Sequence, residues 1–295
     1  MEVPVVRSDR EHRNPLYSRV IVLEATHSNT SPTNVGGVLP DTCWVGPLHA
    51  FDDVTRLSGH SCVVIRLDAH ATPFDYARSL AVIHALVDGP PVVLAGRPNA
   101  HLVRAISGLR TSGIVWEEDI SVHLWPTIAR VRTQAFLAPP LSAMSRSVGV
   151  RPALRIALTR ILARHTPTVR VSQVAREARC HRTTLSKEWR RAHAWHPGWP
   201  ERIEDLLGWI VISHAVALAR PDRKWSWVAE CLGIHTHTVM RLARRLTGLP
   251  LGGLLTDRGA SALGAFVADV TDAPARRGPS GQQIVVKGNK SVIDR

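Results

Sequence analysis

The chain has 295 residues, of which 44% are hydrophobic and 5% aromatic, so it can form one large or two ordinary domains around a packed core. It contains no run of about 18 apolar residues, which argues against a membrane span, and its charged N-terminus has no secretory apolar stretch. Its four cysteines are scattered without a CxxC pair. These features predict a cytoplasmic protein that does not associate with membranes.

The positive charge lies in one half of the sequence. Residues 1–145 carry 12 basic and 13 acidic side chains, whereas residues 146–295 carry 25 basic and 11 acidic ones, a balance of +14. Solubility alone would spread charge more evenly, so the pattern favours a polyanionic partner for the second half. The alternative is a general enrichment in arginine, which the first half does not share.

The first half alternates between apolar runs and amphipathic segments. The apolar runs predict strands at residues 19–24, 62–67, 91–95 and 113–116, and the segments between or after them predict helices at 72–87, 99–109 and 120–132, with a weaker helix at 47–57. In the helix at 72–87 we expect Phe74, Ala77, Leu80, Ala81 and Val87 to face the core, with His84 at its edge. Strands that alternate with helices predict an α/β fold with a parallel sheet covered on both faces.

Composition divides the chain into four segments. Residues 1–138 form the α/β domain, and residues 139–150, which contain Pro139, Pro140 and several serines, are predicted to be a linker. Residues 151–257 are predicted to be all helical. Residues 258–295 are predicted to be a C-terminal extension that is partly disordered, since its last part is polar and contains glycine and proline.

The helical half contains an internal repeat. Residues 174–191 align with residues 228–245 at a constant offset of 54. The identical pairs are Val174/Val228, Ala175/Ala229, His181/His235, Thr184/Thr238, Arg190/Arg244 and Arg191/Arg245. Each copy predicts a short helix capped by Ser172 or Ser226, then a tight turn, then a second helix that starts near the shared histidine.

This arrangement predicts two helix-turn-helix units joined by a long helix at residues 202–219, which is roughly 27 Å long. Val174, Ala175, Leu185 and Trp189, and their counterparts Val228, Ala229, Val239 and Ala243, are expected to face inward. The positions expected to face DNA are Arg182, Thr183, Ser186, Lys187 and Arg190 in copy one, and Thr236, His237, Met240, Arg241 and Arg244 in copy two. A pair of purely structural helical hairpins is the alternative.

Residues 151–255 resemble the DNA-binding domain of the AraC/XylS family of bacterial transcription regulators. The resemblance rests on residues 178–190 and on residues 242–250, where Gly248 ends a helix and Pro250 follows. It implies two recognition helices that read adjacent major grooves of double-stranded DNA. Trp189 stands where the family usually has phenylalanine, and Ala243 stands where it usually has a large aromatic residue.

The first half is similar in outline to a response-regulator receiver domain. Glu24 ends the first strand and Asp68 occupies the phosphoacceptor position, but Ala95-Gly96 and Trp116-Glu117 replace the hydroxyl and the lysine that such domains use. We therefore expect a degenerate receiver-like module that senses a signal or contacts a protein partner or a second copy. Phosphorylation of Asp68 is the alternative.

The sequence contains few other candidates for chemistry. Cys231, His235 and His237 are close in sequence but have no fourth ligand at zinc-site spacing, and the tryptophans between residues 189 and 227 are expected to pack rather than to stack on bases. No nucleotide-binding or hydrolase motif is present. We therefore expect a transcription regulator with no catalytic residues, metal or cofactor; a phosphorylation-responsive regulator, a nucleoid-type DNA-binding protein and an enzyme with a basic localising half are the alternatives.

Overall fold

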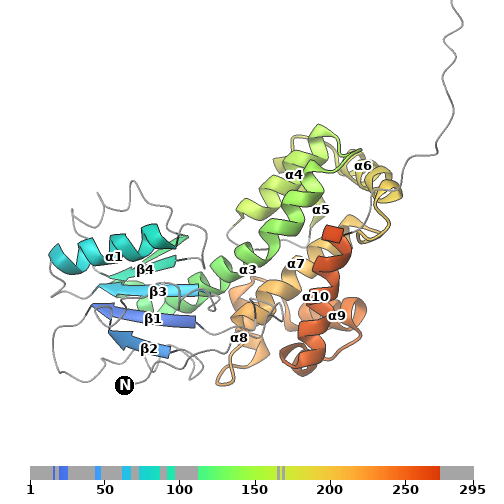
Figure 1. The fold of residues 1–295 in the computed structure, drawn as a ribbon. Coiled ribbons are helices and arrows are strands. Elements are labelled where there is room, and N and C mark those ends of the chain that lie inside the picture. Colours follow the sequence, from blue (N-terminus) through green and yellow to red (C-terminus); the bar gives the residue numbers. More distant parts are fainter. Residues whose placement is uncertain are drawn as a thin grey trace, which may run out of the picture.

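The protein consists of an α/β region followed by a helical region (Figure 1). The computed structural model describes residues 16, 20–25, 44–47, 62–67, 73–86, 92–96, 112–164, 167 and 170–272. The two types of structure follow one another along the chain as the sequence predicts. None of the helices in these ranges is both long and apolar enough to cross a membrane.

The α/β region is built on a five-stranded parallel sheet. Its strands are β1 (Val20–Ala25), β2 (Trp44–Pro47), β3 (Cys62–Leu67), β4 (Val92–Gly96) and β5 (Gly113–Trp116). They lie in the order β2-β1-β3-β4-β5, and every neighbouring pair is parallel. This is the order of flavodoxin-like doubly wound sheets. Four strands were predicted from their apolar runs; β2 was missed because it is short and contains Gly46 and Pro47.

Helix α1 (Pro73–Ala85) lies against β3, but not through the predicted face. Val82 and Ile83 of α1, and Leu86 directly after it, are buried. Phe74 is 64% exposed, and His84 is also exposed. The prediction was wrong because two apolar stripes compete on this helix. Burying three large aliphatic side chains removes more apolar area from water than burying alanines would.

Helix α3 (Ile120–Arg146) connects the two regions (Figure 1). Its first half packs against β4 and β5, and it also contacts α4 (Pro152–Ala163). The predicted linker at residues 139–150 is therefore wrong for residues 139–146, which are helical. Phe136 and Leu137 just before this stretch, and Leu141 and Met144 within it, are buried. Each contributes about 1.5–3 kcal/mol on burial, which together offsets the roughly 3 kcal/mol cost of each interior proline.

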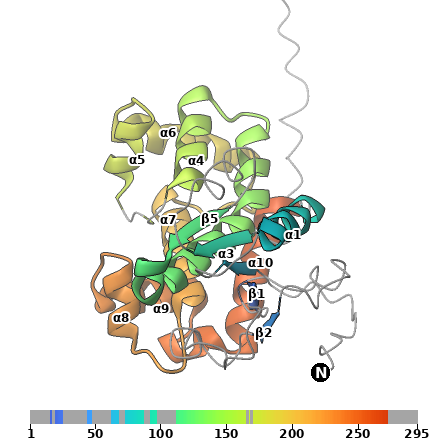
Figure 2. The ribbon, with the colours of Figure 1, turned by 90° about the vertical axis from the view of Figure 1, so that its left-hand side faces the viewer.

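The helical region surrounds α7 (Ile203–Leu218), which is buried on nearly all sides. The other elements are α5 (Val171–Glu177), α6 (Arg182–Trp195), α8 (Trp225–Cys231), α9 (Thr236–Thr247), the 3₁₀ helix η5 (Leu251–Leu255) and α10 (Asp257–Asp272). Figure 2 shows the pair α5–α6 and the pair α8–α9 at opposite ends of this region, as does Figure 1.

Helix α10 forms the first part of the predicted C-terminal extension, since residues 257–272 are helical. Leu263, Phe266 and Val270 are buried, and the Phe266 ring stacks on Trp209 of α7 with 4.8 Å between centroids. The spacing of these apolar residues is that of an amphipathic helix and was overlooked. Residues 273–295, the predicted helix at 99–109, most of the weaker helix at 47–57, and Asp68 lie outside the described residues.

Candidate nucleic-acid interface

The two helical pairs, α5–α6 and α8–α9, repeat one backbone conformation. Their helices begin 54 residues apart, and their turns close with equivalent hydrogen bonds. The Cys180 N–H donates to the Ala175 carbonyl at 2.9 Å, and the Ile234 N–H donates to the Ala229 carbonyl at 3.0 Å. The residue before each donor is left-handed: Arg179 has φ 52° and Gly233 has φ 64°. The sequence repeat therefore corresponds to a structural repeat.

The first helix of each pair does not begin as predicted. Arg170 and Lys224 occupy the N-cap positions of α5 and α8, so Ser172 and Ser226 lie inside the helices rather than capping them. The second helices do begin beside the shared histidine. The His181 Nδ1 accepts the Thr183 N–H at 3.3 Å, whereas His235 provides no side-chain cap to α9.

Buried side chains hold each second helix against the core. The predicted inward residues are all at most 2% exposed: Val174, Ala175, Leu185 and Trp189 in the first pair, and Val228, Ala229, Val239 and Ala243 in the second. The Trp189 Nε1–H donates to the Pro200 carbonyl at 3.0 Å, and its ring packs on Trp199 with centroids 5.6 Å apart. Trp209, Trp225 and Trp227 are partly buried and pack against the core, whereas Trp195 is 37% exposed.

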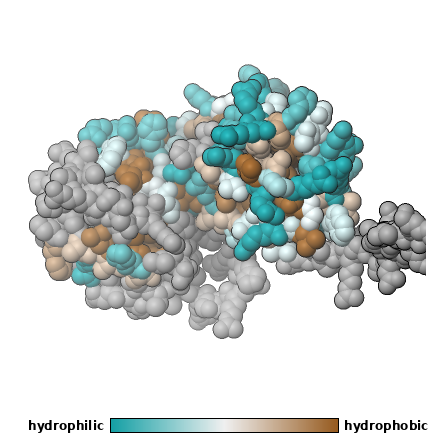
Figure 3. Space-filling view, turned by 90° about the horizontal axis from the view of Figure 1, so that it is seen from above, coloured by the Kyte–Doolittle hydropathy of each residue, from teal (hydrophilic) through white to brown (hydrophobic). Residues whose placement is uncertain are grey.

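None of the ten predicted DNA-facing side chains is buried. Arg182, Thr183, Lys187, Arg190, His237, Arg241 and Arg244 are exposed, and Ser186, Thr236 and Met240 are partly exposed. The repeat thus places polar and basic side chains outward at equivalent positions of α6 and α9. Figure 3 views the molecule from the end at which α4 and α6 lie, and it shows hydrophilic side chains gathered over that end of the helical region.

Two acidic residues at the start of α7 connect both second helices to this central helix. The Arg245 Nη2 of α9 lies 2.8 Å from the Asp205 Oδ1, and the Arg182 Nη2 of α6 lies 3.9 Å from the Glu204 Oε1. The first distance fits a charge-assisted hydrogen bond, while the second is a looser and more exposed pair. We did not expect these contacts from the sequence, although carboxylates in a first helical turn are favourable there and are a recognisable signal.

The helix α7 also approaches α9 closely at Gly208. A side chain at this position would come within 2.8 Å of the Leu246 Cδ1 and 3.1 Å of the Leu242 Cδ2. The glycine therefore allows the second pair to pack directly on α7. With Asp205–Arg245 nearby, the position of α9 is fixed by both packing and charge.

The α/β region offers little for phosphoryl chemistry among its described residues. Glu24 at the end of β1 is buried, and its Oε1 accepts from the Arg66 Nη1 of β3 at 2.9 Å. Gly96 leaves no space for a side chain, because a Cβ there would lie 2.4 Å from the Leu67 carbonyl oxygen. The carboxylate that would help to hold a metal ion in a receiver domain is therefore paired with an internal cation.

Within the described part of the chain, no three histidine, cysteine, aspartate or glutamate side chains lie close enough to hold a metal ion. Cys231, His235 and His237 thus do not form such a group.

No family model, curated protein or solved structure matches the chain. Its function must therefore be inferred from the geometry and charge of its own residues.

Proposed function

We propose that the protein is a sequence-specific DNA-binding transcription regulator of the AraC/XylS type. In this proposal the pairs α5–α6 and α8–α9 are helix-turn-helix units, and α6 and α9 each lie in a major groove of the same duplex. The observation that carries the proposal is the repeat itself: at an offset of 54, inward positions are buried in both copies, and outward positions are accessible and, except for Met240, polar or basic.

Geometry supports two adjacent grooves. Helix α7 has 16 residues and is therefore about 24 Å long. The pairs lie at opposite ends of the helical region (Figure 2). Successive major grooves on one face of a duplex are about 34 Å apart, a separation that two units held by such a helix can reach.

The charges of the outward side chains support binding to DNA. Arg182, Lys187, Arg190, Arg241 and Arg244 carry positive charge to the accessible faces of α6 and α9. Contacts from such residues to phosphates provide salt-dependent affinity, whereas contacts to base edges provide specificity. In the α/β region, the sheet order and the pairing of Glu24 with Arg66 favour a receiver-like module that works without phosphorylation, by contacting a protein or a second copy.

The test begins by selecting sequences that the purified full-length protein retains from a library of random duplexes. We expect one bipartite motif with half-sites about one helical turn apart. Retention of all sequences with equal affinity at fixed salt would contradict specificity and would instead support nucleoid-type binding.

Variants of the selected complex then test the two helices separately. Lys187→Ala and Arg241→Ala are equivalent positions, and each should weaken binding and reduce the salt dependence by about one counterion. Arg182→Ala should weaken binding about tenfold. The matched control is Arg160→Ala, since Arg160 is an exposed arginine on α4, outside both pairs. Equal affinities for the control and for all three variants, measured by fluorescence anisotropy, would contradict the assignment of α6 and α9.

A further inference from the structure

The last arginine of each second helix occupies an equivalent position in the two helical pairs but is held differently. Arg191 of α6 corresponds to Arg245 of α9 at the offset of 54. The Arg191 Nη1 donates to the Glu188 Oε1 at 3.0 Å, within the same helix. The Arg245 Nη2 instead lies 2.8 Å from the Oδ1 of Asp205, which belongs to α7. The same arginine therefore forms an ion pair inside its own helix in α6 and between two helices in α9.

The residue that replaces Glu188 in the second copy accounts for this difference. It is Leu242, so Arg245 has no carboxylate at the corresponding place on its own helix. Leu242 packs over Gly208 of α7, where a Cβ would lie 3.1 Å from the Leu242 Cδ2 and 3.6 Å from the Arg245 Nη2. Asp205 and Gly208 are three residues apart and share one face of α7. Charge and close packing thus hold α9 on a single strip of that helix.

Helix α6 has a weaker ionic link to α7. The Arg182 Nη2 lies 3.9 Å from the Glu204 Oε1, and both side chains are accessible to water, so this ion pair contributes little. The stronger ionic contact of α6 is with the start of α4, where the Arg151 Nε lies 3.3 Å from the Glu188 Oε2. Figures 1 and 2 both show α6 beside α4, whereas α9 packs on α7. The two second helices therefore rest on different helices of the core.

We propose that Asp205 is a positioning residue that fixes the separation of α6 and α9 through Arg245, and thereby restricts the protein to duplexes with one spacing of half-sites. The inference rests on the proposed function, since it concerns how the two pairs read DNA together. The Asp205 side chain is 23% exposed, against 40% for Glu204, and its bond to the guanidinium is short and therefore directional. Because this bond crosses the interface between the helices, it opposes sliding and rotation of α9 on α7.

The geometry of the duplex makes a fixed separation selective. One additional base pair between the half-sites moves the second half-site by about 3.4 Å along the axis and turns it by roughly 35°. A helix that Leu242 and Arg245 hold on α7 cannot follow this movement without breaking its ion pair. Asp205 thus selects the spacing of the half-sites through α9 and not through a base contact of its own.

The first experiment measures the separation of α6 and α9 in the full-length protein without DNA. Spin labels are attached at the exposed, equivalent positions Lys187 and Arg241 through a ketone-bearing amino acid, so that the native cysteines stay unlabelled. Double electron–electron resonance should give one narrow distance distribution when Asp205 is present. The distribution should be about twice as broad in Asp205→Asn, because α9 then samples more than one arrangement on α7. Asp205→Glu retains the carboxylate and should restore the narrow distribution.

Glu201→Gln is the matched control. Glu201 is an exposed acid at the same end of α7, and it forms no ion pair with any residue that the structure describes. Its loss should leave the distribution narrow. Arg245→Gln breaks the same ion pair from the other side and replaces Asp205→Asn if circular dichroism shows that variant to be unfolded. An unchanged distribution in the folded variant, or one that is equally broad in Asp205→Glu or Glu201→Gln, would overturn the proposal.

The second experiment compares the selected duplex with the same duplex carrying one extra base pair between its half-sites. The insertion should weaken binding of the wild type about tenfold, but that of Asp205→Asn only about threefold, since α9 can then follow the displaced half-site. Equal penalties in the two proteins, measured by fluorescence anisotropy, would overturn the proposal. Failure to select any bipartite duplex would contradict the proposed function instead, and the resonance experiment would still decide whether Asp205 positions α9.

Discussion

The two helical pairs share a backbone but are stabilised by different side chains. In the first pair, Trp189 fills the core position and contacts Trp199, and Glu188 receives both Arg151 and Arg191. In the second pair the position equivalent to Trp189 is the small Ala243, and α9 instead packs directly on α7. The comparison shows that the conformation of the pair depends on only a few features, namely a buried inward stripe, a left-handed turn residue and a helix that starts after a histidine.

The largest difference between the pairs should appear when the first loses its aromatic anchor. Trp189→Ala removes a side chain that is 1% exposed and leaves the Pro200 carbonyl without its donor. We expect the free energy of unfolding to fall by about 3–5 kcal/mol, because truncation of a large core residue leaves a cavity. Urea denaturation followed by tryptophan fluorescence measures this change.

Trp195→Ala is the matched control, since Trp195 is on the same helix but is 37% exposed. We expect its effect to be less than about 1 kcal/mol. Similar losses in the two variants would mean that α6 is not anchored through Trp189. The second pair would then be the better-anchored one.

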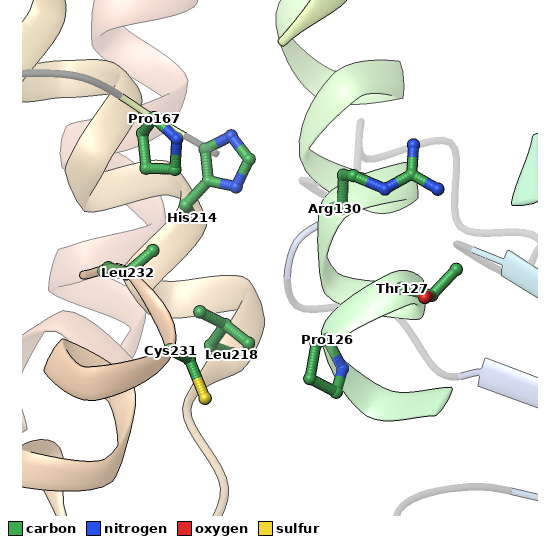
Figure 4. Close-up of a pocket in the computed structure, with 8 residues that line it drawn as sticks. All are labelled: Pro126, Thr127, Arg130, Pro167, His214, Leu218, Cys231 and Leu232. Atoms are coloured by element: carbon green, nitrogen blue, oxygen red, sulfur yellow. The ribbon is translucent and has the colours of Figure 1, made fainter. Parts of the chain in front are cut away.

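A second difference concerns the pH dependence of stability. The buried His214 of α7 lines a small pocket together with Cys231 and Leu232 of the second pair, at the end of α8 (Figure 4). The folded protein lowers the pKa of His214 from 6.5 to about 4. Between about pH 4 and pH 6.5 the His214 side chain is protonated in the unfolded chain but neutral in the folded protein. The contribution of this group to stability is therefore complete above pH 6.5 and is lost as the pH falls toward 4, by about 3 kcal/mol in all.

The difference between wild type and His214→Gln, measured by urea denaturation from pH 7 to pH 4.5, isolates this contribution from that of the carboxylates. The variant should lose stability less steeply on acidification than the wild type. His237→Gln, which changes an exposed histidine of α9, should retain the wild-type slope. Parallel curves for wild type and His214→Gln would show that burial does not perturb this ring.

The elements that could be predicted from sequence are those whose apolar pattern or repeat is compatible with only one kind of secondary structure. Four of the five strands are continuous apolar runs, and the repeat located all four helices of the pairs. The helix across Pro139 and Pro140 was missed because local proline signals are outweighed by burial of apolar side chains that only the tertiary structure provides. The acidic first turn of α7 is visible in the sequence, but its partners Arg182 and Arg245 are not, because they depend on how distant helices approach one another. The burial of His214 depends on the same long-range packing.

The smallest difference lies in the turns, where the left-handed residue is Arg179 in one pair and Gly233 in the other. The left-handed conformation destabilises the folded state by about 1–2 kcal/mol when the residue is not glycine. Glycine avoids this cost, but part of the advantage is lost because glycine has more conformational freedom in the unfolded chain. We therefore expect Arg179→Gly to raise the free energy of unfolding by up to about 1 kcal/mol and Gly233→Ala to lower it by about 1 kcal/mol. No atom lies within 4 Å of a Cβ built at Gly233, so backbone strain rather than crowding would cause the loss. Urea denaturation at neutral pH measures both changes, and Gly264→Ala on α10, where a Cβ also meets open space but the backbone is helical, is the control and should not destabilise the protein. If both turn variants shift stability in the same direction, the two turns differ in more than the identity of this one residue.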